Sequence, residues 1–297
     1  MSDATAPVPA LPDGIRLENV GGAPALVVET PASTAVVHLD GAHVTSWVPA
    51  GDREVLWMSP DATIGEGEAI RGGIPLIGPW FGPGRDGATT PKHGWLRTHR
   101  WSVTAAERLG DAAAVVLELT GADPSGQGIA ALCFVGVGGH LTVELTVTAG
   151  VAPLELESAL HSYLAIGDVR RVRLEGFAGA DYLDNLDGLA RRHQEGELAL
   201  TGPTDRVYEI DGEVAVADPV LGRTVREEPA GSSRTVVWNP WDEGAAGIGD
   251  MPDDAWTGFV CVETAVAKDG YVSLAPGEEH ALRVRLVVEE GVGEEAA

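Results

Sequence analysis

Short apolar runs of strand length recur along almost the whole chain, and they limit the possible folds more than any other feature of the sequence. They are rich in β-branched residues and are separated by turn residues. In the run LTVELTV, which begins at Leu141, apolar and polar residues alternate, as is typical of a sheet with one buried face. Convincing amphipathic helices are absent, and only PDDAW, near Pro252, is compatible with a single helical turn. We therefore predict an all-β sandwich or barrel.

The expected strands share a length of four to thirteen residues and a high content of Val, Leu, Ile and Thr. They lie at residues 25–30, 34–39, 43–48, 55–58, 113–120, 128–135, 141–149, 154–166, 171–177, 213–218, 234–238, 258–263, 271–275 and 280–288.

Composition limits the partners of the chain. The 297 residues are 44% hydrophobic, which indicates a globular fold with a substantial core. The net charge of -25 argues against nucleic acid and anionic membranes as partners, because the average surface repels both. An anionic small molecule remains possible where local basic residues gather in one cleft. The two cysteines, Cys133 and Cys261, lie in apolar runs without a CxxC spacing, so we expect buried thiols and no metal site.

The domain organisation is expected to be simple. Residues 1–13 lack periodicity and predict a mobile tail, residues 14–289 form one domain without a linker or repeat, and the acidic residues 290–297 predict a solvated tail. The chain begins without a secretory signal and contains no apolar run of membrane-spanning length, so we expect a cytoplasmic protein, and a monomer.

The segment 71–101 interrupts the strand pattern. Its many Gly and Pro residues exclude a regular helix or a central strand, so it should be a long ordered loop, and such loops are often functional. Its polar side chains include Arg71, Lys92, His93 and Arg97, a basic group in an acidic chain. Lys92 is one of only two lysines in the sequence. This composition predicts a pocket for an anionic ligand.

Several motifs in this order resemble those of the glucose-6-phosphate 1-epimerases, within the aldose 1-epimerase superfamily. They are RGGIP at residue 71 with HGWLR at residue 93, LHSYLAIGD at residue 160, VVWNPW at residue 236 and FVCVETA at residue 259. The resemblance covers nearly the whole chain, from about residue 41 onward. It implies a single large antiparallel β-supersandwich with the site on a concave sheet face.

His161 and Glu263 each lie in an alternating strand-like run. His161 should share a face with Ala159 and Tyr163, and Glu263 should share a face with Cys261 and Ala265. From the residues alone, His161 fits a structural histidine as well as a catalytic one. A solvent-facing Glu263 is the more common outcome, because Glu is seldom fully buried unless it is paired.

The resemblance implies that His161 and Glu263 are the catalytic pair of a hexose-6-phosphate mutarotase. Interconversion of sugar anomers removes the proton of the C1 hydroxyl and protonates the ring oxygen, so that the C1–O5 bond opens. Glu263 as carboxylate is expected to accept the first proton, and His161 as imidazolium to supply the second. The reaction needs no cofactor, metal, nucleotide or redox group.

The same resemblance implies a set of substrate-binding residues. Arg71, Lys92 and Arg97 match the phosphate-contacting positions, and a guanidinium suits this role because it can bind phosphate through two parallel hydrogen bonds. His93 is expected to contact the sugar near its ring oxygen, and Asp205 to orient the substrate or a catalytic group.

Three alternatives remain open on the sequence. The chain could be an epimerase of unphosphorylated aldoses, or a sugar-phosphate-binding protein without turnover. A glycoside hydrolase is more distant, because it needs two carboxylates flanking the scissile bond and the sequence offers one clear candidate.

Overall fold

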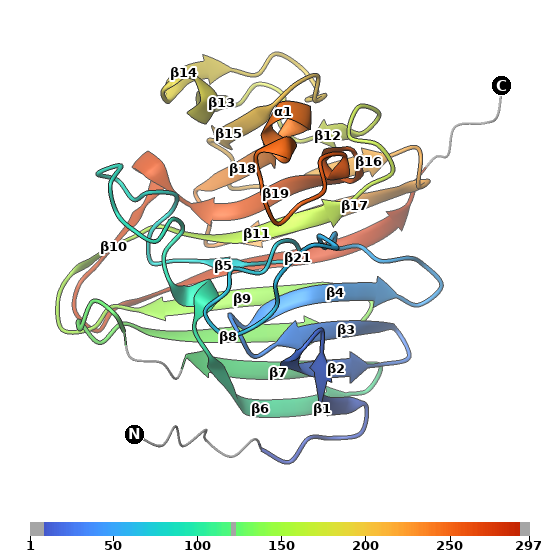
Figure 1. Ribbon diagram of the computed structural model, residues 1–297, viewed down its shortest axis with the longest axis vertical. Helices are drawn as coiled ribbons and strands as arrows, with labels where there is room; N and C mark the ends of the chain where they lie inside the picture. Colours follow the sequence, from blue (N-terminus) through green and yellow to red (C-terminus); the bar gives the residue numbers. More distant parts are fainter. Residues whose placement is uncertain (1–8, 120–122, 292–297) are drawn as a thin grey trace.

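Three antiparallel sheets make up most of the protein (Figure 1). The computed structural model describes residues 9–119 and 123–291. Within these residues, every pairing between named strands is antiparallel, which confirms the predicted all-β class.

The three sheets differ in size and in the order of their strands. The four-stranded sheet contains, from edge to edge, β1 (Ile15–Val20), β2 (Ala23–Glu29), β3 (Ser33–His38) and β4 (His43–Pro49). The strand order of the eight-stranded sheet is β12 (Arg173–Glu175), β16 (Val214–Asp218), β17 (Arg223–Ala230), β21 (Glu279–Glu290), β9 (Leu141–Thr148), β8 (Ala130–Val137), β7 (Ala112–Leu119) and β6 (Trp101–Leu109). The strand order of the seven-stranded sheet is β14 (Ala190–His193), β13 (Asp181–Asp184), β15 (Thr204–Tyr208), β18 (Arg234–Asn239), β19 (Phe259–Val266), β11 (Ser158–Ala165) and β5 (Leu76–Ile77). A two-stranded ribbon joins β10 (Leu154–Leu156) to β20 (Val272–Leu274).

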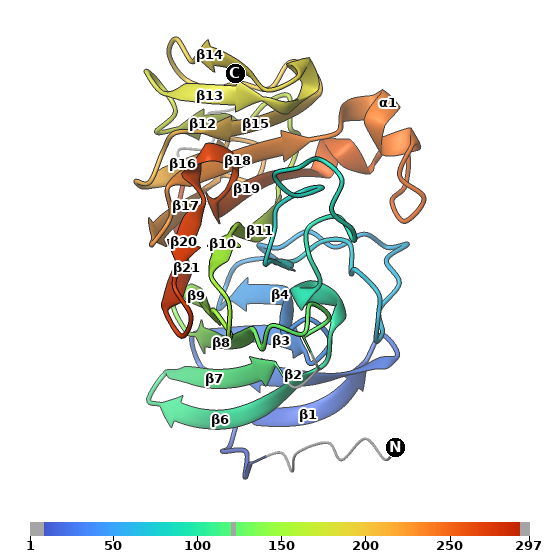
Figure 2. The ribbon, with the colours of Figure 1, turned by 90° about the vertical axis from the view of Figure 1, so that its left-hand side faces the viewer.

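The seven- and eight-stranded sheets pack on each other, and β21 contacts both β11 and β19 across the layers. A continuous core of buried aliphatic and aromatic side chains includes residues of these two sheets and of the four-stranded sheet. Figure 2 shows β17 and β21 on one side of β18 and β19, with the Gly- and Pro-rich loop and α1 on the other. This loop and α1 therefore lie over the outer face of the seven-stranded sheet.

The helices are few and short in the described chain. They are α1 (Trp241–Ala246) and the 3-10 turns η1 (Leu96–Thr98), η2 (Asn185–Asp187), η3 (Ala255–Gly258) and η4 (Lys268–Gly270). None of them is long and apolar enough to span a bilayer. The turn expected at PDDAW is present as η3, which begins at Ala255, whereas α1 was not predicted.

The segment 71–101 is ordered and lies largely outside regular structure, as predicted. The exceptions are η1, Trp101 at the start of β6, and β5, whose two residues extend the sheet beside β11. A close backbone approach holds the loop together. A Cβ atom on Gly94 would lie 1.9 Å from the carbonyl oxygen of Gly78, and Gly94 has a φ of +68°. Only glycine fits this position.

The tail predictions concern residues mostly outside the described ranges. Residues 1–8 and 292–297 are not described, β1 begins at Ile15, and β21 continues to Glu290, the first residue of the expected C-terminal tail. The run at 55–58 is not a strand, because Leu56 and Met58 form only isolated bridges to Leu164 and Gly72.

Candidate active site

His161 and Glu263 are direct cross-strand partners in the antiparallel pair of β11 and β19. Their side chains project from the same face of the seven-stranded sheet, and His161 Nε2 lies 3.2 Å from Glu263 Oε1. Tyr163, two residues along β11, stacks on the His161 ring with centroids 4.8 Å apart and planes inclined by 11°. The alternation of side chains predicted for each strand is present, and the register of β11 and β19 brings the His161 imidazole and the Glu263 carboxyl together.

Both members of the pair are buried, with exposed fractions of 7% for His161 and 1% for Glu263. They lie between two apolar clusters on this face, one around Phe81 and Val236 and the other around Tyr163 and Phe259. This surrounding surface removes water from both groups and thereby destabilises their charged forms.

The resulting pKa shifts run in opposite directions. Burial holds the pKa of His161 well below its usual value, and the positive charges of Arg97 and Arg71 act in the same sense. Burial also raises the pKa of Glu263 well above its usual value, with a further contribution from Asp205. Before substrate binds, the neutral forms are therefore favoured, and the pair holds one proton. This state differs from the imidazolium–carboxylate pair expected from the sequence, because the apolar clusters penalise both charges.

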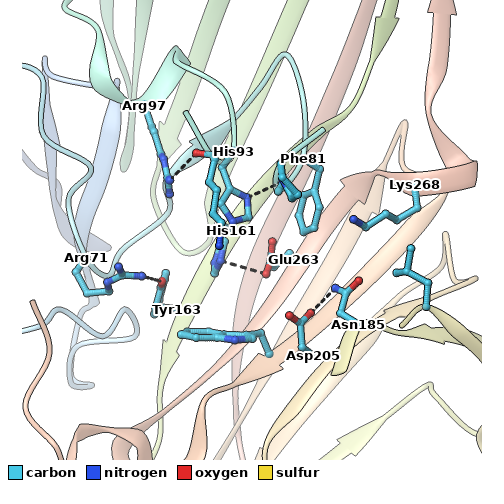
Figure 3. A pocket seen from close by; sticks show the side chains of 15 residues that line it. Arg71, Phe81, His93, Arg97, His161, Tyr163, Asn185, Asp205, Glu263 and Lys268 are labelled. Carbon is cyan, nitrogen blue, oxygen red and sulfur yellow. Dashed lines mark hydrogen bonds and ion pairs between the residues drawn. The ribbon is translucent and has the colours of Figure 1, made fainter. Parts of the chain in front are cut away.

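A cavity of about 520 Å³ opens over this pair, a size suited to a small-molecule ligand. All seven residues expected at the site line it (Figure 3). They come from separate parts of the chain, namely the loop residues Arg71, Lys92, His93 and Arg97, together with His161 on β11, Asp205 on β15 and Glu263 on β19.

The two arginines differ in their partners. Arg71 Nε lies 3.1 Å from Asp250 Oδ1, and its Nη1 donates to the Tyr163 hydroxyl at 3.1 Å. Arg97 donates from Nη2 to the carbonyl oxygen of Lys92 at 3.0 Å, and its buried Nε makes no hydrogen bond within the described chain. No described carboxylate forms an ion pair with Arg97, and burial lowers the pKa of its guanidinium. Arg97 is therefore a poorly solvated cation beside the cavity, and an anion would stabilise it.

His93 is fixed in one neutral tautomer. Its Nδ1 accepts a hydrogen bond from the Gly82 amide at 3.3 Å, which leaves the ring proton on Nε2. Burial lowers the pKa of His93 to about 3, and the charges of Arg97 and Lys92 add to this effect. The ring stays neutral near pH 7 and can donate from Nε2, so His93 is suited to binding rather than to acid catalysis.

Asp205 lies on the same face, since it pairs with Trp238 of β18, which in turn pairs with Cys261 of β19. Its Oδ1 accepts from Asn185 Nδ2 at 2.5 Å, and burial raises the pKa of its carboxyl. Asn185 and Trp238 were not predicted as site residues. Trp238 lies in the VVWNPW motif, whereas Asn185 carries no local sequence signal for this role.

Lys268 is a further lining residue that was not predicted. One signal could have revealed it, because Lys268 and Lys92 are the only two lysines of the chain.

Comparison with known proteins identifies the family of the chain. The aldose 1-epimerase family profile matches residues 24–287. A protein of Escherichia coli strain K12 with the name "Putative glucose-6-phosphate 1-epimerase" is 34% identical over 250 residues, which cover 82% of this chain and 83% of that protein. A Salmonella typhimurium crystal structure described as "a putative mutarotase" matches with a TM-score of 0.87 and 28% identity over 97% of both chains.

A galactose 1-epimerase from Lactobacillus acidophilus NCFM has a TM-score of 0.74 at 14% identity, covering 95% of this chain and all of that one, and so shares the fold. The galactose mutarotase-like β-supersandwich predicted from the sequence is thereby confirmed. On the family match over residues 24–287 and the identity to the bacterial relatives, the chain belongs to the aldose 1-epimerase family.

Proposed function

We propose that this protein interconverts the α and β anomers of a hexose 6-phosphate, with glucose 6-phosphate as the first candidate. The observation that carries the proposal is the position of Arg97, a half-buried cation with a buried Nε and no carboxylate partner in the described chain, in the same cavity as the His161–Glu263 pair. Arg71 and Lys92 add positive charge beside it. The names of the relatives in Escherichia coli and Salmonella typhimurium support the same substrate class.

In the proposed reaction, Glu263 and His161 act on the two oxygens bonded to C1. Glu263 as carboxylate takes the proton of the C1 hydroxyl, while protonated His161 gives a proton to the ring oxygen O5. The C1–O5 bond breaks, and an open-chain aldehyde forms beside a neutral imidazole and a carboxylic acid. Rotation about C1–C2 followed by the reverse proton transfers closes the ring as the other anomer.

Phosphate binding also helps to prepare this pair. Arg97 and Arg71 disfavour the imidazolium form of His161. A phosphate dianion bound to these arginines offsets their charge, so the proton shared by the pair moves toward His161 and leaves Glu263 as the base. The phosphorylated substrate would thus promote the charge state that its own ring opening requires.

One observation favours a second candidate, an epimerase of unphosphorylated aldoses. Arg71 is already engaged by Asp250 and Tyr163, which leaves it less available to a phosphate group. A binding protein without turnover is less well supported, because the 3.2 Å separation of His161 and Glu263 suits proton transfer.

Anomer exchange measured by NMR saturation transfer, with the uncatalysed rate subtracted, separates these candidates. We expect a higher kcat/KM for glucose 6-phosphate than for glucose. Arg97→Met should lower kcat/KM for glucose 6-phosphate about ten- to a hundredfold, as for loss of a charged hydrogen bond, and should lower that for glucose much less. Arg85→Met is the matched control, because Arg85 lies in the same loop but pairs with Glu155 outside this cavity. Equal kcat/KM values for both sugars in the unmodified protein would refute the phosphate assignment.

A further inference from the structure

Lys268 occupies the end of the cavity that the phosphate assignment leaves unexplained. Figure 3 shows Arg71 and Arg97 on one side of the catalytic pair, and Lys268 on the other. The chain carries 45 acidic residues and only two lysines, and both lysines line this one cavity. Lys92 belongs to the phosphate end, whereas Lys268 follows β19, the strand of Glu263.

The backbone of Lys268 is held in place by a buried carboxyl. Lys268 begins η4 with a φ of +58°, which is a strained conformation for a residue with a side chain. Its amide donates to Glu157 Oε1 at 2.7 Å, and the Phe81 amide reaches Glu157 Oε2 at 3.3 Å. Glu157 is 1% exposed and lies at the break between β10 and β11. One buried side chain thus joins the loop wall at Phe81 to the start of η4.

The amine of Lys268 is directed along this wall into the cavity. Its Nζ lies 5.5 Å from the centre of the Phe81 ring, and a Cβ atom on Gly82 would lie 3.9 Å from Nζ. Within the described ranges, no carboxylate forms an ion pair with Lys268 and its amine makes no hydrogen bond. An ammonium group has three protons to donate, so the Lys268 amine can bind acceptor oxygens of a ligand in the cavity.

Asp205 and Asn185 lie at the same end of the cavity and complete its polar surface (Figure 3). Asp205 accepts the Asn185 amide through Oδ1, and its other oxygen can accept from a hydroxyl. A donor on Lys268 beside an acceptor on Asp205 suits a sugar hydroxyl, which both donates and accepts.

The geometry of a pyranose determines which hydroxyls reach this end. C5, which carries the C6 phosphate arm, and C1 flank the ring oxygen. With the phosphate at Arg97, O5 at His161 and C1 at Glu263, the ring turns C2 and C3 toward the side of Lys268. We propose that Lys268 is a substrate-contacting residue that, together with Asp205, recognises the hydroxyls on C2 and C3, and that Glu157 is its positioning residue. This assignment rests on the proposed function for the orientation of the sugar.

A double-change cycle, in which the Lys268 amine and one sugar hydroxyl are removed singly and together, tests the contact. Anomer exchange is measured for glucose 6-phosphate and its 2-deoxy and 3-deoxy analogues, with the unmodified protein and with Lys268→Met, which keeps the chain length and removes the charge. In the unmodified protein we expect loss of the contacted hydroxyl to lower kcat/KM about ten- to a hundredfold. In Lys268→Met the same change of substrate should lower kcat/KM only a few-fold, because the interaction is already absent. Lys92→Met is the contrasting variant. Its kcat/KM should fall between glucose 6-phosphate and the deoxy sugars by the same factor as in the unmodified protein.

Glu157→Gln tests the positioning role. Glutamine keeps the shape but offers one acceptor oxygen for two amides, so Lys268 should lose its fixed position. We expect the hydroxyl discrimination to fall as in Lys268→Met, and the double variant to show no further loss of discrimination. A purely structural Glu157 would lower kcat/KM for all three substrates by the same factor, and that result would overturn its assigned role.

The Lys268 contact is overturned if Lys268→Met lowers kcat/KM equally for all three substrates. It is also overturned if the variant changes only the preference for phosphorylated over unphosphorylated sugar, which would place Lys268 in the phosphate site. The failure of the proposed function is separate, because it appears as equal kcat/KM values for glucose and glucose 6-phosphate in the unmodified protein. The cycle can then be repeated with glucose, 2-deoxyglucose and 3-deoxyglucose, and its outcome still decides the role of Lys268.

Discussion

Replacement of Glu227 by glutamine should stabilise the protein at neutral pH and have little effect in acid. Glu227 lies on β17, between β16 and β21, and its side chain is 1% exposed. Neither carboxyl oxygen makes a regular hydrogen bond within the described residues. Burial raises the pKa of this carboxyl well above its usual value, and the neighbouring Ser162 hydroxyl offsets only part of the effect.

The size of the effect follows from proton linkage. In the unfolded chain the carboxyl ionises with its ordinary pKa of 4.5, whereas the folded protein keeps it protonated to higher pH. Above pH 4.5 folding therefore takes up a proton, and the free energy of unfolding falls by about 1.4 kcal/mol for each pH unit while the folded state retains that proton. At pH 7 the accumulated loss is at most about 3 kcal/mol. Glutamine has a similar shape and does not titrate, so it removes this loss.

Urea unfolding of the unmodified protein and of Glu227→Gln, at pH 4.5 and at pH 7, measures the effect. The difference in free energy of unfolding should grow in favour of the variant as pH rises. Glu107→Gln, at an exposed position on β6, is the matched control and should change the free energy of unfolding little. A Glu227→Gln difference that is equal at the two pH values, or that turns against the variant at pH 7, would refute a buried, protonated carboxyl.

Two further predictions concern the pair and the loop. Because the pKa of His161 is lowered and that of Glu263 is raised, the pair should keep a single proton through neutral pH. The kcat for unphosphorylated glucose should therefore stay constant between about pH 6 and 7. A fall of kcat to half its value near pH 6.5 would indicate an ordinary histidine instead. Gly94→Ala should lower the free energy of unfolding by more than about 2 kcal/mol in denaturant titration, because the added methyl group meets the Gly78 carbonyl. Gly110 is the control, since it has a similar φ of +64° and no atom within 4 Å of an added Cβ, and Gly110→Ala should cost about 1 kcal/mol. Equal losses for the two glycine variants would show that the close approach does not matter.

Local patterns were sufficient for much of the fold. The alternation in 141–149 predicted β9, and the alternation around His161 and Glu263 predicted which neighbours share their faces. The register that sets His161 opposite Glu263 is a contact between strands about a hundred residues apart, and alternation alone cannot choose it. The resemblance to a known family supplied that part of the prediction.

The elements that were missed have physical reasons. Helix α1 has six residues, contains Gly244 and begins with Trp241 at a φ of +59°, so it has neither the length nor the periodicity that predicts a helix. The run 154–166 is divided at Glu157, whose carboxyl binds backbone amides of two distant segments. Lys268 reaches the cavity through that same tertiary contact, which no local pattern encodes.

The role of Glu263 as the proton acceptor is tested by Glu263→Gln. Glutamine keeps the size of the side chain and removes the proton acceptor that the mechanism places at C1. Anomer exchange of glucose 6-phosphate, followed by NMR saturation transfer, should fall by about a hundred- to ten-thousandfold in kcat, while the sugar phosphate still binds in a titration followed by calorimetry. Exchange at the unmodified rate in Glu263→Gln, with binding retained, would show that Glu263 is not the base.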